Sequence, residues 1–237
     1  MNDKCYSYCS KSFSMENKIM NSKLLPRSIA TIVIFFLINF GLWEIIVHLG
    51  MSNSWASFTV YLVLFIIILF IWKENIPNSW TRFKSETGNW KKFFLSTVVW
   101  LVIAIALSYF LQFLVSGTSQ TDNTETVGNM ANTIPPILTC IMLSVFTPFI
   151  EEFTFRESFM GFVDKENKVL LTTMTLLSII IFDCIHLYNW REFFYYLPLS
   201  IALTMFYRKH NRNIFSSILM HSMANLPGAI LMIVGIL

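Results

Sequence analysis

The sequence is poor in charged residues. Only 13% of its 237 residues are Asp, Glu, Lys or Arg, whereas a soluble domain typically has about 25%. The net charge of +3 also offers no basic surface for nucleic acid. The apolar share is 55% and the mean hydropathy is +0.59. These values exclude a disordered chain and an ordinary soluble enzyme, and they predict one compact polytopic membrane domain.

Signatures of metal and phosphate sites are also missing. The four cysteines, Cys5, Cys9, Cys140 and Cys184, do not have the spacing of metal ligands. The sequence contains no His-Glu-x-x-His motif, no glycine-rich phosphate loop and no evident internal repeat. We therefore expect no metal, no cofactor and no nucleic-acid partner.

Long hydrophobic runs, by contrast, are abundant. A helix that crosses the hydrocarbon core needs about 20 mostly apolar residues. Seven segments reach or approach this length, which predicts an all-α membrane bundle of about seven transmembrane helices. They cover residues 28–49, 55–72, 93–115, 137–155, 169–187, 193–207 and 214–237. We expect an N-terminal tail over residues 1–27 and a single transmembrane domain over residues 28–237.

The basic residues predict the orientation of these spans. Sixteen of the seventeen Lys and Arg residues fall in the tail or in alternate connecting segments, and only Arg191 falls in the others. Because cytoplasmic loops are enriched in Lys and Arg, the N-terminus and its tail are predicted to be cytoplasmic. The residues between Lys73 and Lys92 are predicted to lie along the inner interface.

Ionisable residues at membrane depth are costly, so each is a candidate for function. The first cluster is the adjacent pair Glu151 and Glu152, followed by Arg156. Glu152 and Arg156 are spaced i,i+4 and can neutralise each other on one helix face. Glu151 points about 100° away and lacks that partner, which suits it to general acid or base chemistry. A helix anchor at the inner interface or a proton relay explains the same pair.

Two further clusters lie in later spans. Phe182 and His186 share a helix face, and Asp183 is placed to orient the imidazole of His186. In the last span, His221 and Asn225 are again spaced i,i+4, and both side chains donate hydrogen bonds when neutral. Taken singly, these residues also fit a hydrogen-bonded histidine at a helix end and polar contacts between helices.

Together the three clusters supply a base, a group that orients water and two donors for an oxyanion. These are the parts that hydrolysis of an amide needs when no covalent intermediate forms. The predicted helix boundaries, however, do not place these residues in one site. On straight helices His186 lies ~25 Å from the cytoplasmic end of its span and His221 only ~10 Å from that of its own. A common site therefore requires a kink, a tilt or different helix boundaries.

The three motifs resemble those of the CPBP intramembrane glutamic proteases, which include CAAX prenyl proteases and Abi-type proteins of bacteriocin processing or immunity. The family pattern is Glu-Glu-x-x-x-Arg, Phe-x-x-x-His and His-x-x-x-Asn. It is matched here by Glu151-Glu152 with Arg156, by Phe182 with His186, and by His221 with Asn225. The resemblance covers residues 148–225. Glu157 departs from it, because members often have glycine after the arginine.

The resemblance implies a role for each of these residues. Glu151 would activate a water molecule that His186 positions, and His221 and Asn225 would form the oxyanion hole. Glu152 and Arg156 would hold the helix of the catalytic acid, with Phe182 in support. The activity implied is that of a metal-independent endopeptidase acting on a peptide or protein substrate at the lipid bilayer.

The amino-acid composition also indicates the kind of organism and membrane. The abundance of Ile, Phe, Asn and Lys is typical of an AT-rich genome and favours a bacterial plasma membrane. In that setting we expect peptide maturation or self-immunity to a bacteriocin. Two alternatives remain open: a non-catalytic immunity or partner-binding protein with the same fold, and a proton-coupled transporter.

Overall fold

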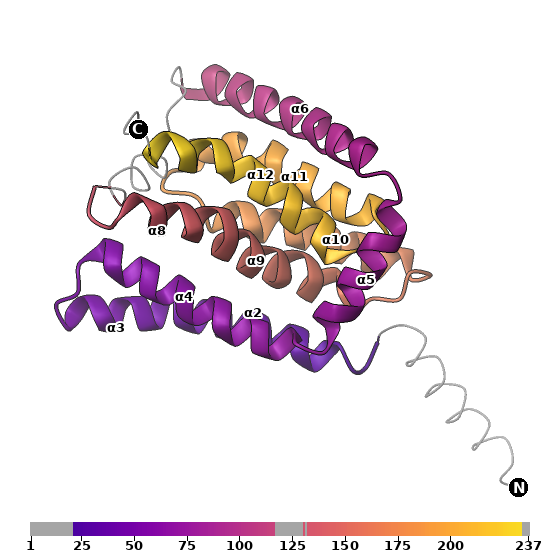
Figure 1. Cartoon of the computed structure of the whole chain (residues 1–237), viewed down its shortest axis with the longest axis horizontal. Helices are drawn as coiled ribbons and strands as arrows, with labels where there is room; N and C mark the ends of the chain where they lie inside the picture. Colours follow the sequence, from indigo (N-terminus) through magenta and orange to yellow (C-terminus); the bar gives the residue numbers. More distant parts are fainter. Residues whose placement is uncertain (1–20, 117–129, 131, 234–237) are drawn as a thin grey trace, which may run out of the picture.

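The computed structural model describes residues 21–116, 130 and 132–233, and these residues form helices with no β-strand among them. The predicted all-α bundle is therefore confirmed. Figure 1 shows the long helices lying side by side, with one shorter helix, α5, running across their ends. Most of the predicted tail, with Cys5 and Cys9, and the loop 117–129 lie outside the described residues.

The first half of the chain forms a helical pair, a connecting helix and an outer helix. These are α2 (Leu25–Phe36), η1 (Leu37–Leu42) and α3 (Trp43–His48) as one continuous rod, then α4 (Asn53–Trp72), α5 (Asn75–Thr87) and α6 (Trp90–Ser116). The rod begins three residues before the predicted span, because a proline is well accommodated in the first turn of a helix.

The second half forms four long helical segments. The first is the rod of α8 (Pro136–Ile141), η2 (Met142–Phe146), α9 (Thr147–Glu151) and η3 (Glu152–Gly161). It is followed by α10 (Lys168–Cys184), the short η4 (Trp190–Glu192), α11 (Phe193–Lys209) and α12 (Ile214–Ile233). The first rod continues six residues beyond the predicted end of its span at Phe155, and α10 ends before His186.

All seven predicted spans correspond to helices. Five of them are long and apolar enough to cross a membrane by length and composition: Leu25–His48, Asn53–Trp72, Trp90–Val115, Pro136–Gly161 and Ile214–Ile233. The other two, α10 and α11, have 17 residues each. The chain is thus an integral membrane protein.

The rod that carries the acidic pair is not a regular α-helix. Its segments η2 and η3 are π-helical, and η3 extends over ten residues. The hydroxyl of Ser158 donates to the carbonyl of Phe153, five residues back, at 2.8 Å. Such wide turns are rare and frequently mark functional sites. The uniform α-helix assumed from the sequence is therefore wrong here.

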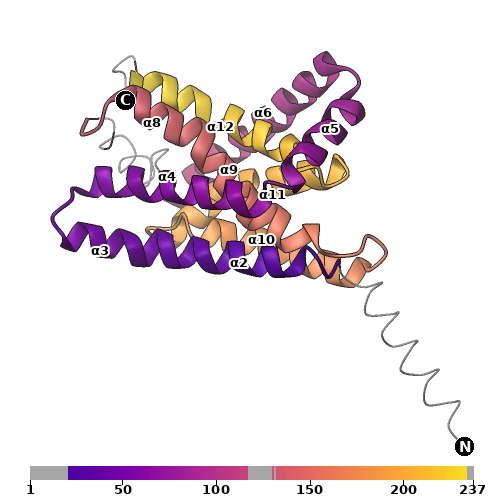
Figure 2. The same ribbon diagram turned by 60° about the horizontal axis from the view of Figure 1, so that its bottom comes forward.

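Aromatic side chains align the first half of the chain with this rod. Phe65 of α4 contacts the rings of Phe146 and Phe149 at 4.7 and 4.9 Å between centroids, and Trp72 contacts Phe153 at 5.4 Å. Residue numbers rise together along the contact, so α4 and the rod run parallel. In Figure 2 the α2–α3 rod and α4 lie side by side as one layer. This layer covers one side of the helix that bears Glu151.

Candidate active site

The acidic pair lies at the junction of α9 and η3, in the interior of the bundle. Glu151 is 1% exposed, and Glu152 and Arg156 are fully buried. Burial of an ionised group is costly unless it is paired and hydrogen-bonded. The contacts of each carboxylate therefore decide what it can do.

Glu152 is held from two helices. Its Oε1 lies 3.3 Å from Arg156 Nη1 and 2.9 Å from His221 Nδ1 on α12. The guanidinium of Arg156 stacks over the ring of Phe182 on α10, 3.9 Å from its centroid. The pair expected from the i,i+4 spacing is thus present, and it joins η3 to α10 and α12.

Glu151 faces both histidines. Its Oε1 lies 3.8 Å from His186 Nε2, and its Oε2 lies 3.8 Å from His221 Nε2. These separations exceed a direct hydrogen bond and match a gap that one water molecule can bridge. Glu151, His186 and His221 therefore surround one small polar space.

His186 is oriented by the main chain. Its Nδ1 lies 2.7 Å from the carbonyl oxygen of Phe182, and since a carbonyl only accepts, Nδ1 carries the hydrogen. In the neutral ring Nε2 is then an acceptor that faces Glu151. The imidazole also packs between the rings of Phe182 and Tyr196, at 4.7 and 5.2 Å.

The expectation that Asp183 orients His186 is wrong. Within the described part of the chain, neither carboxylate oxygen of Asp183 has a hydrogen-bond partner, although the residue is fully buried. Because α10 ends at Cys184, His186 lies beyond the helix and turns back onto the carbonyl of Phe182 instead.

Asn225 is attached to the rod that bears Glu151. Its Nδ2 donates to the carbonyl oxygen of Leu143 at 2.9 Å. One amide hydrogen is therefore engaged and the second remains available for another acceptor. His221 lies one turn earlier on α12, and its Nδ1 is engaged by Glu152.

The conflict between helix depths is resolved by the start of α10. Thr175 of α10 lies beside Met160, with its hydroxyl 3.4 Å from the sulfur, and Arg212 donates to the carbonyl of Met160 just before α12 begins. Thr175 and the start of α12 are therefore at one level. The first seven residues of α10, ~10 Å of helix, extend past that level. This removes most of the ~15 Å difference expected for straight helices, and both imidazoles lie 3.8 Å from the carboxylate of Glu151.

The extra acid Glu157 lies away from this space. Its Oε2 accepts a hydrogen bond from the hydroxyl of Tyr207 at 2.7 Å, and it interacts with Arg82 and Arg212. Glu157 is therefore hydrogen-bonded to α11 and not to the residues that face Glu151. Among the residues that the structure describes, no group of three His, Cys, Asp or Glu side chains is arranged to hold a metal ion.

Tyr196 was not found from the sequence. It lies on α11 and its ring covers His186, yet it follows a run of aromatic residues with no distinguishing spacing. Only the pairing of α10 with α11, where the hydroxyl of Ser200 donates to the carbonyl of Ile179 at 3.1 Å, places it there.

Comparisons with known proteins point to one family. Residues 133–227 match the family model described as "Type II CAAX prenyl endopeptidase Rce1-like". Two relatives come from Lactococcus lactis subsp. lactis (strain IL1403). UPF0177 protein YbdI is 28% identical over 177 residues, 70% of this chain and 91% of its own length. UPF0177 protein YxdF is 27% identical over 179 residues, 70% of this chain and 90% of its own length. No solved structure matches the chain significantly.

Proposed function

We propose that this chain, whose residues 133–227 match the model of the Rce1-like family of type II CAAX prenyl endopeptidases, is an intramembrane glutamic endopeptidase. One observation carries the proposal. Each oxygen of the buried Glu151 carboxylate faces an imidazole Nε2 at 3.8 Å. A carboxylate and an acceptor nitrogen at that separation are suited to hold the two hydrogens of one water molecule.

The charge of the buried groups favours this chemistry. Ionised Glu151 and Glu152 beside a single guanidinium, Arg156, leave one excess negative charge in the interior, which burial opposes. His221 lies between the two acids, with Nδ1 2.9 Å from Glu152 and Nε2 3.8 Å from Glu151, and the proposed reaction uses both ring nitrogens as hydrogen-bond donors. The site then contains a base and a donor at once.

The proposed reaction begins at the water molecule between Glu151 and His186. Glu151 accepts one of its protons while the water oxygen bonds to the carbonyl carbon of the peptide. The electron pair of the carbonyl moves to its oxygen, which His221 Nε2–H and the second amide hydrogen of Asn225 stabilise. When the carbon–nitrogen bond breaks, Glu151 passes its proton to the leaving nitrogen. The products are a carboxyl group and a free amine.

The proposed substrate is a membrane-proximal peptide or protein, and the proposed location is a bacterial plasma membrane. The apolar helices and the bacterial relatives from Lactococcus support this setting. Peptide maturation and bacteriocin self-immunity are the two processes proposed for it. The burial of Glu151 and His221 also fits a site that works out of contact with bulk water.

A non-catalytic immunity or partner-binding protein is the alternative, with a proton-coupled transporter third. The experiment that separates them compares Glu151→Gln with the wild type, expressed at equal levels in a bacterial host. The matched control is Glu157→Gln, which alters an acid of the same rod that points away from the site. Membrane-associated and secreted peptides are identified by mass spectrometry.

We expect a peptide fragment in the wild type and in Glu157→Gln. In Glu151→Gln its formation should fall by about 10²–10⁴-fold, the usual contribution of a general base, and the uncut precursor should accumulate. Identical peptide profiles for the wild type and Glu151→Gln, with both proteins inserted, would refute proteolysis. Protection against a bacteriocin that survives Glu151→Gln would favour binding.

A further inference from the structure

The donors available to an oxyanion at this site are few. Asn225 donates one amide hydrogen to the carbonyl of Leu143, and Nδ1 of His221 is hydrogen-bonded to Glu152. The Nε2 of His221 also faces the carboxylate of Glu151. A tetrahedral oxyanion is commonly stabilised by two or more preorganised donors, so a further donor near Glu151 would matter for the rate.

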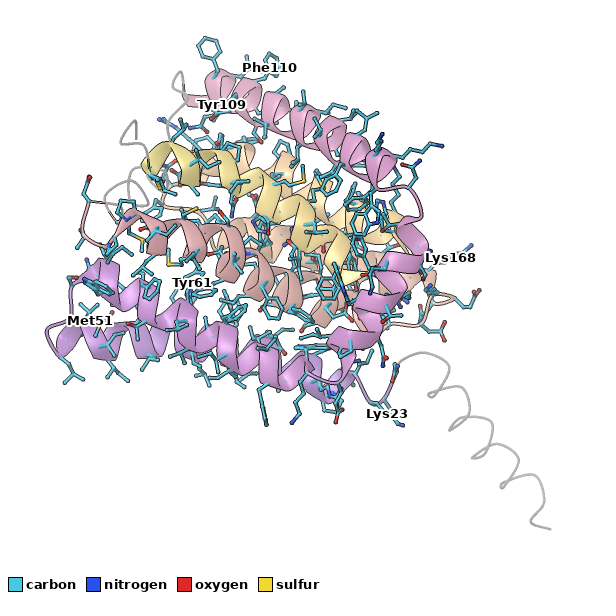
Figure 3. The ribbon with its side chains drawn as sticks, viewed as in Figure 1. Lys23, Met51, Tyr61, Tyr109, Phe110 and Lys168 are labelled. Carbon is cyan, nitrogen blue, oxygen red and sulfur yellow. The ribbon has the colours of Figure 1, made fainter. Side chains whose placement is uncertain are left out.

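The face of α4 that packs on the Glu151 helix carries one polar aromatic residue. Phe58 and Phe65 of this face both contact the ring of Phe146, at 6.4 and 4.7 Å between centroids. Tyr61 lies between them in the sequence, at i+3 from Phe58 and i−4 from Phe65, and therefore shares their face. Figure 3 shows Tyr61 between α4 and the α8–α9 rod.

The packing of Tyr61 places it beside the rod that bears Glu151. Its ring contacts both the main apolar core and the smaller cluster of Met130, Ile134 and Met142. Its phenol lies within electrostatic range of the Glu151 carboxylate and of the phenol of Tyr188, which follows His186 in the chain. Tyr61 therefore lies on the side of the Glu151 rod that α4 covers.

The hydroxyl of Tyr61 is not engaged by any of the residues that the structure describes. A tyrosine hydroxyl in an apolar setting usually has a hydrogen-bond partner. A phenol is a good donor and remains neutral at physiological pH. A carbonyl oxygen of a bound peptide, positioned beside Glu151, would complete its hydrogen bonding.

We propose that Tyr61 is a catalytic residue whose phenol donates a hydrogen bond to the carbonyl oxygen of the scissile peptide bond. This inference rests on the proposed function and adds to it a donor from α4, outside the region that matches the family. The first half of the chain then contributes directly to the chemistry. The hydrogen bond from the phenol strengthens as negative charge develops on the carbonyl oxygen. It therefore stabilises the transition state more than the bound substrate.

The test uses the purified full-length protein in mild detergent. Its substrate is a quenched fluorescent peptide containing the bond cut in the cellular comparison. Tyr61→Phe removes one oxygen and keeps the ring, so the packing against Phe146 is retained. Tyr109→Phe is the matched control, because it removes a hydroxyl on α6, at the opposite edge of the bundle in Figure 3. Thermal unfolding of each variant checks that the fold is intact.

We expect Tyr61→Phe to lower kcat by about 10²-fold with little change in KM and an unaltered pH profile, as loss of an oxyanion donor does. Tyr109→Phe should match the wild type. Unchanged kcat in Tyr61→Phe would overturn the proposal. So would a shifted pH profile with little loss of kcat, because the phenol would then act on Glu151 alone. If Glu151→Gln also cleaves the peptide, the proposed function itself has failed, which the Tyr61 variant alone does not imply.

Discussion

The two halves of the chain use their helices differently. In the most apolar stretch of Leu25–His48 only 11% of the residues are buried, and in that of Asn53–Trp72 22%, against 56% in Pro136–Gly161. The first two helices thus present most of their surface outward, where lipid replaces water as the solvent. The rod of the second half is surrounded by protein, and it is there that the charged groups lie. Burial by protein, rather than depth in the bilayer alone, is what permits the polar site.

The first half of the chain nevertheless makes specific side-chain contacts with the second half. On α4 every fourth residue is buried, in the series Ala56, Val60, Leu64, Ile68 and Trp72. The indole of Trp72 donates to the hydroxyl of Thr31 at 2.9 Å, which joins α4 to α2. Phe35 of α2 packs edge-on against Phe155 of η3 at 5.2 Å. The outer layer therefore supports the π-helical segment that follows Glu151.

Arg156 is the buried charge whose removal we expect to destabilise the protein most. Replacing it in Arg156→Met removes the guanidinium and leaves Glu152 buried beside a single histidine. Breaking a buried ion pair from one side costs about 3–5 kcal/mol, so we expect a fall in unfolding free energy of that size. The measurement is unfolding by sodium dodecyl sulfate from mild detergent.

An exposed arginine provides the control for this change. Arg191→Met, in η4 just before α11, should shift the unfolding free energy by no more than about 0.5 kcal/mol. Adding Glu152→Gln to Arg156→Met removes the stranded charge and should recover part of the loss. Equal stability of Arg156→Met and Arg191→Met would contradict the assignment of a buried pair.

Asn225 tests whether the buried groups serve chemistry or packing. Asn225→Ala removes a proposed oxyanion donor, and we expect peptide cleavage to fall by about 10²–10³-fold. Loss of the bond to the Leu143 carbonyl should cost only about 1 kcal/mol of unfolding free energy. Activity in cells and unfolding in detergent are compared for the same variant. A transporter that uses the acid pair would be indifferent to this change, and undiminished cleavage would argue against the proposed role.

The smallest effect is expected in the first half, at the exposed pair of Arg27 and Glu74. The neighbouring guanidinium holds the pKa of Glu74 below its usual value. A lowered carboxyl pKa contributes stability that is fully present above the ordinary pKa and is lost as the pH falls from there through the lowered pKa of the folded protein. Glu74→Gln should therefore lower the thermal midpoint slightly at pH 7. Near pH 3 the difference from the wild type should be smaller, and an equal difference at both pH values would show that charge is not its cause.

The sequence predicted the spans better than their internal geometry. Runs of apolar residues are a local property, so all seven predicted spans correspond to helices, with errors of up to six residues at their ends. The pairing of Glu152 with Arg156 also follows from local spacing. The π-helical turns could not be predicted, because the hydrogen-bond register inside a helix has no clear signal in an apolar sequence.

Residues that meet across helices were predicted only where the family motif linked them. His186 and His221 lie 35 positions apart and reach Glu151 because α10 begins below the level of α12. The spacing predicts that Asp183 orients His186, but α10 ends at Cys184, and the Nδ1 of His186 bonds to the Phe182 carbonyl instead. Tyr61 carries no motif at all, and its place depends on how α4 packs.

The sequence by itself determined that this protein is a helical membrane protein, which residues are charged at depth, and which of them share a helix turn. These properties depend on composition and on spacing within a few residues. Only the tertiary structure decided which atoms face Glu151, since that depends on helix ends, π-turns and the level at which each helix starts. Small shifts in these features move a side chain by several ångströms, and hydrogen bonds form only within a narrow range of distance.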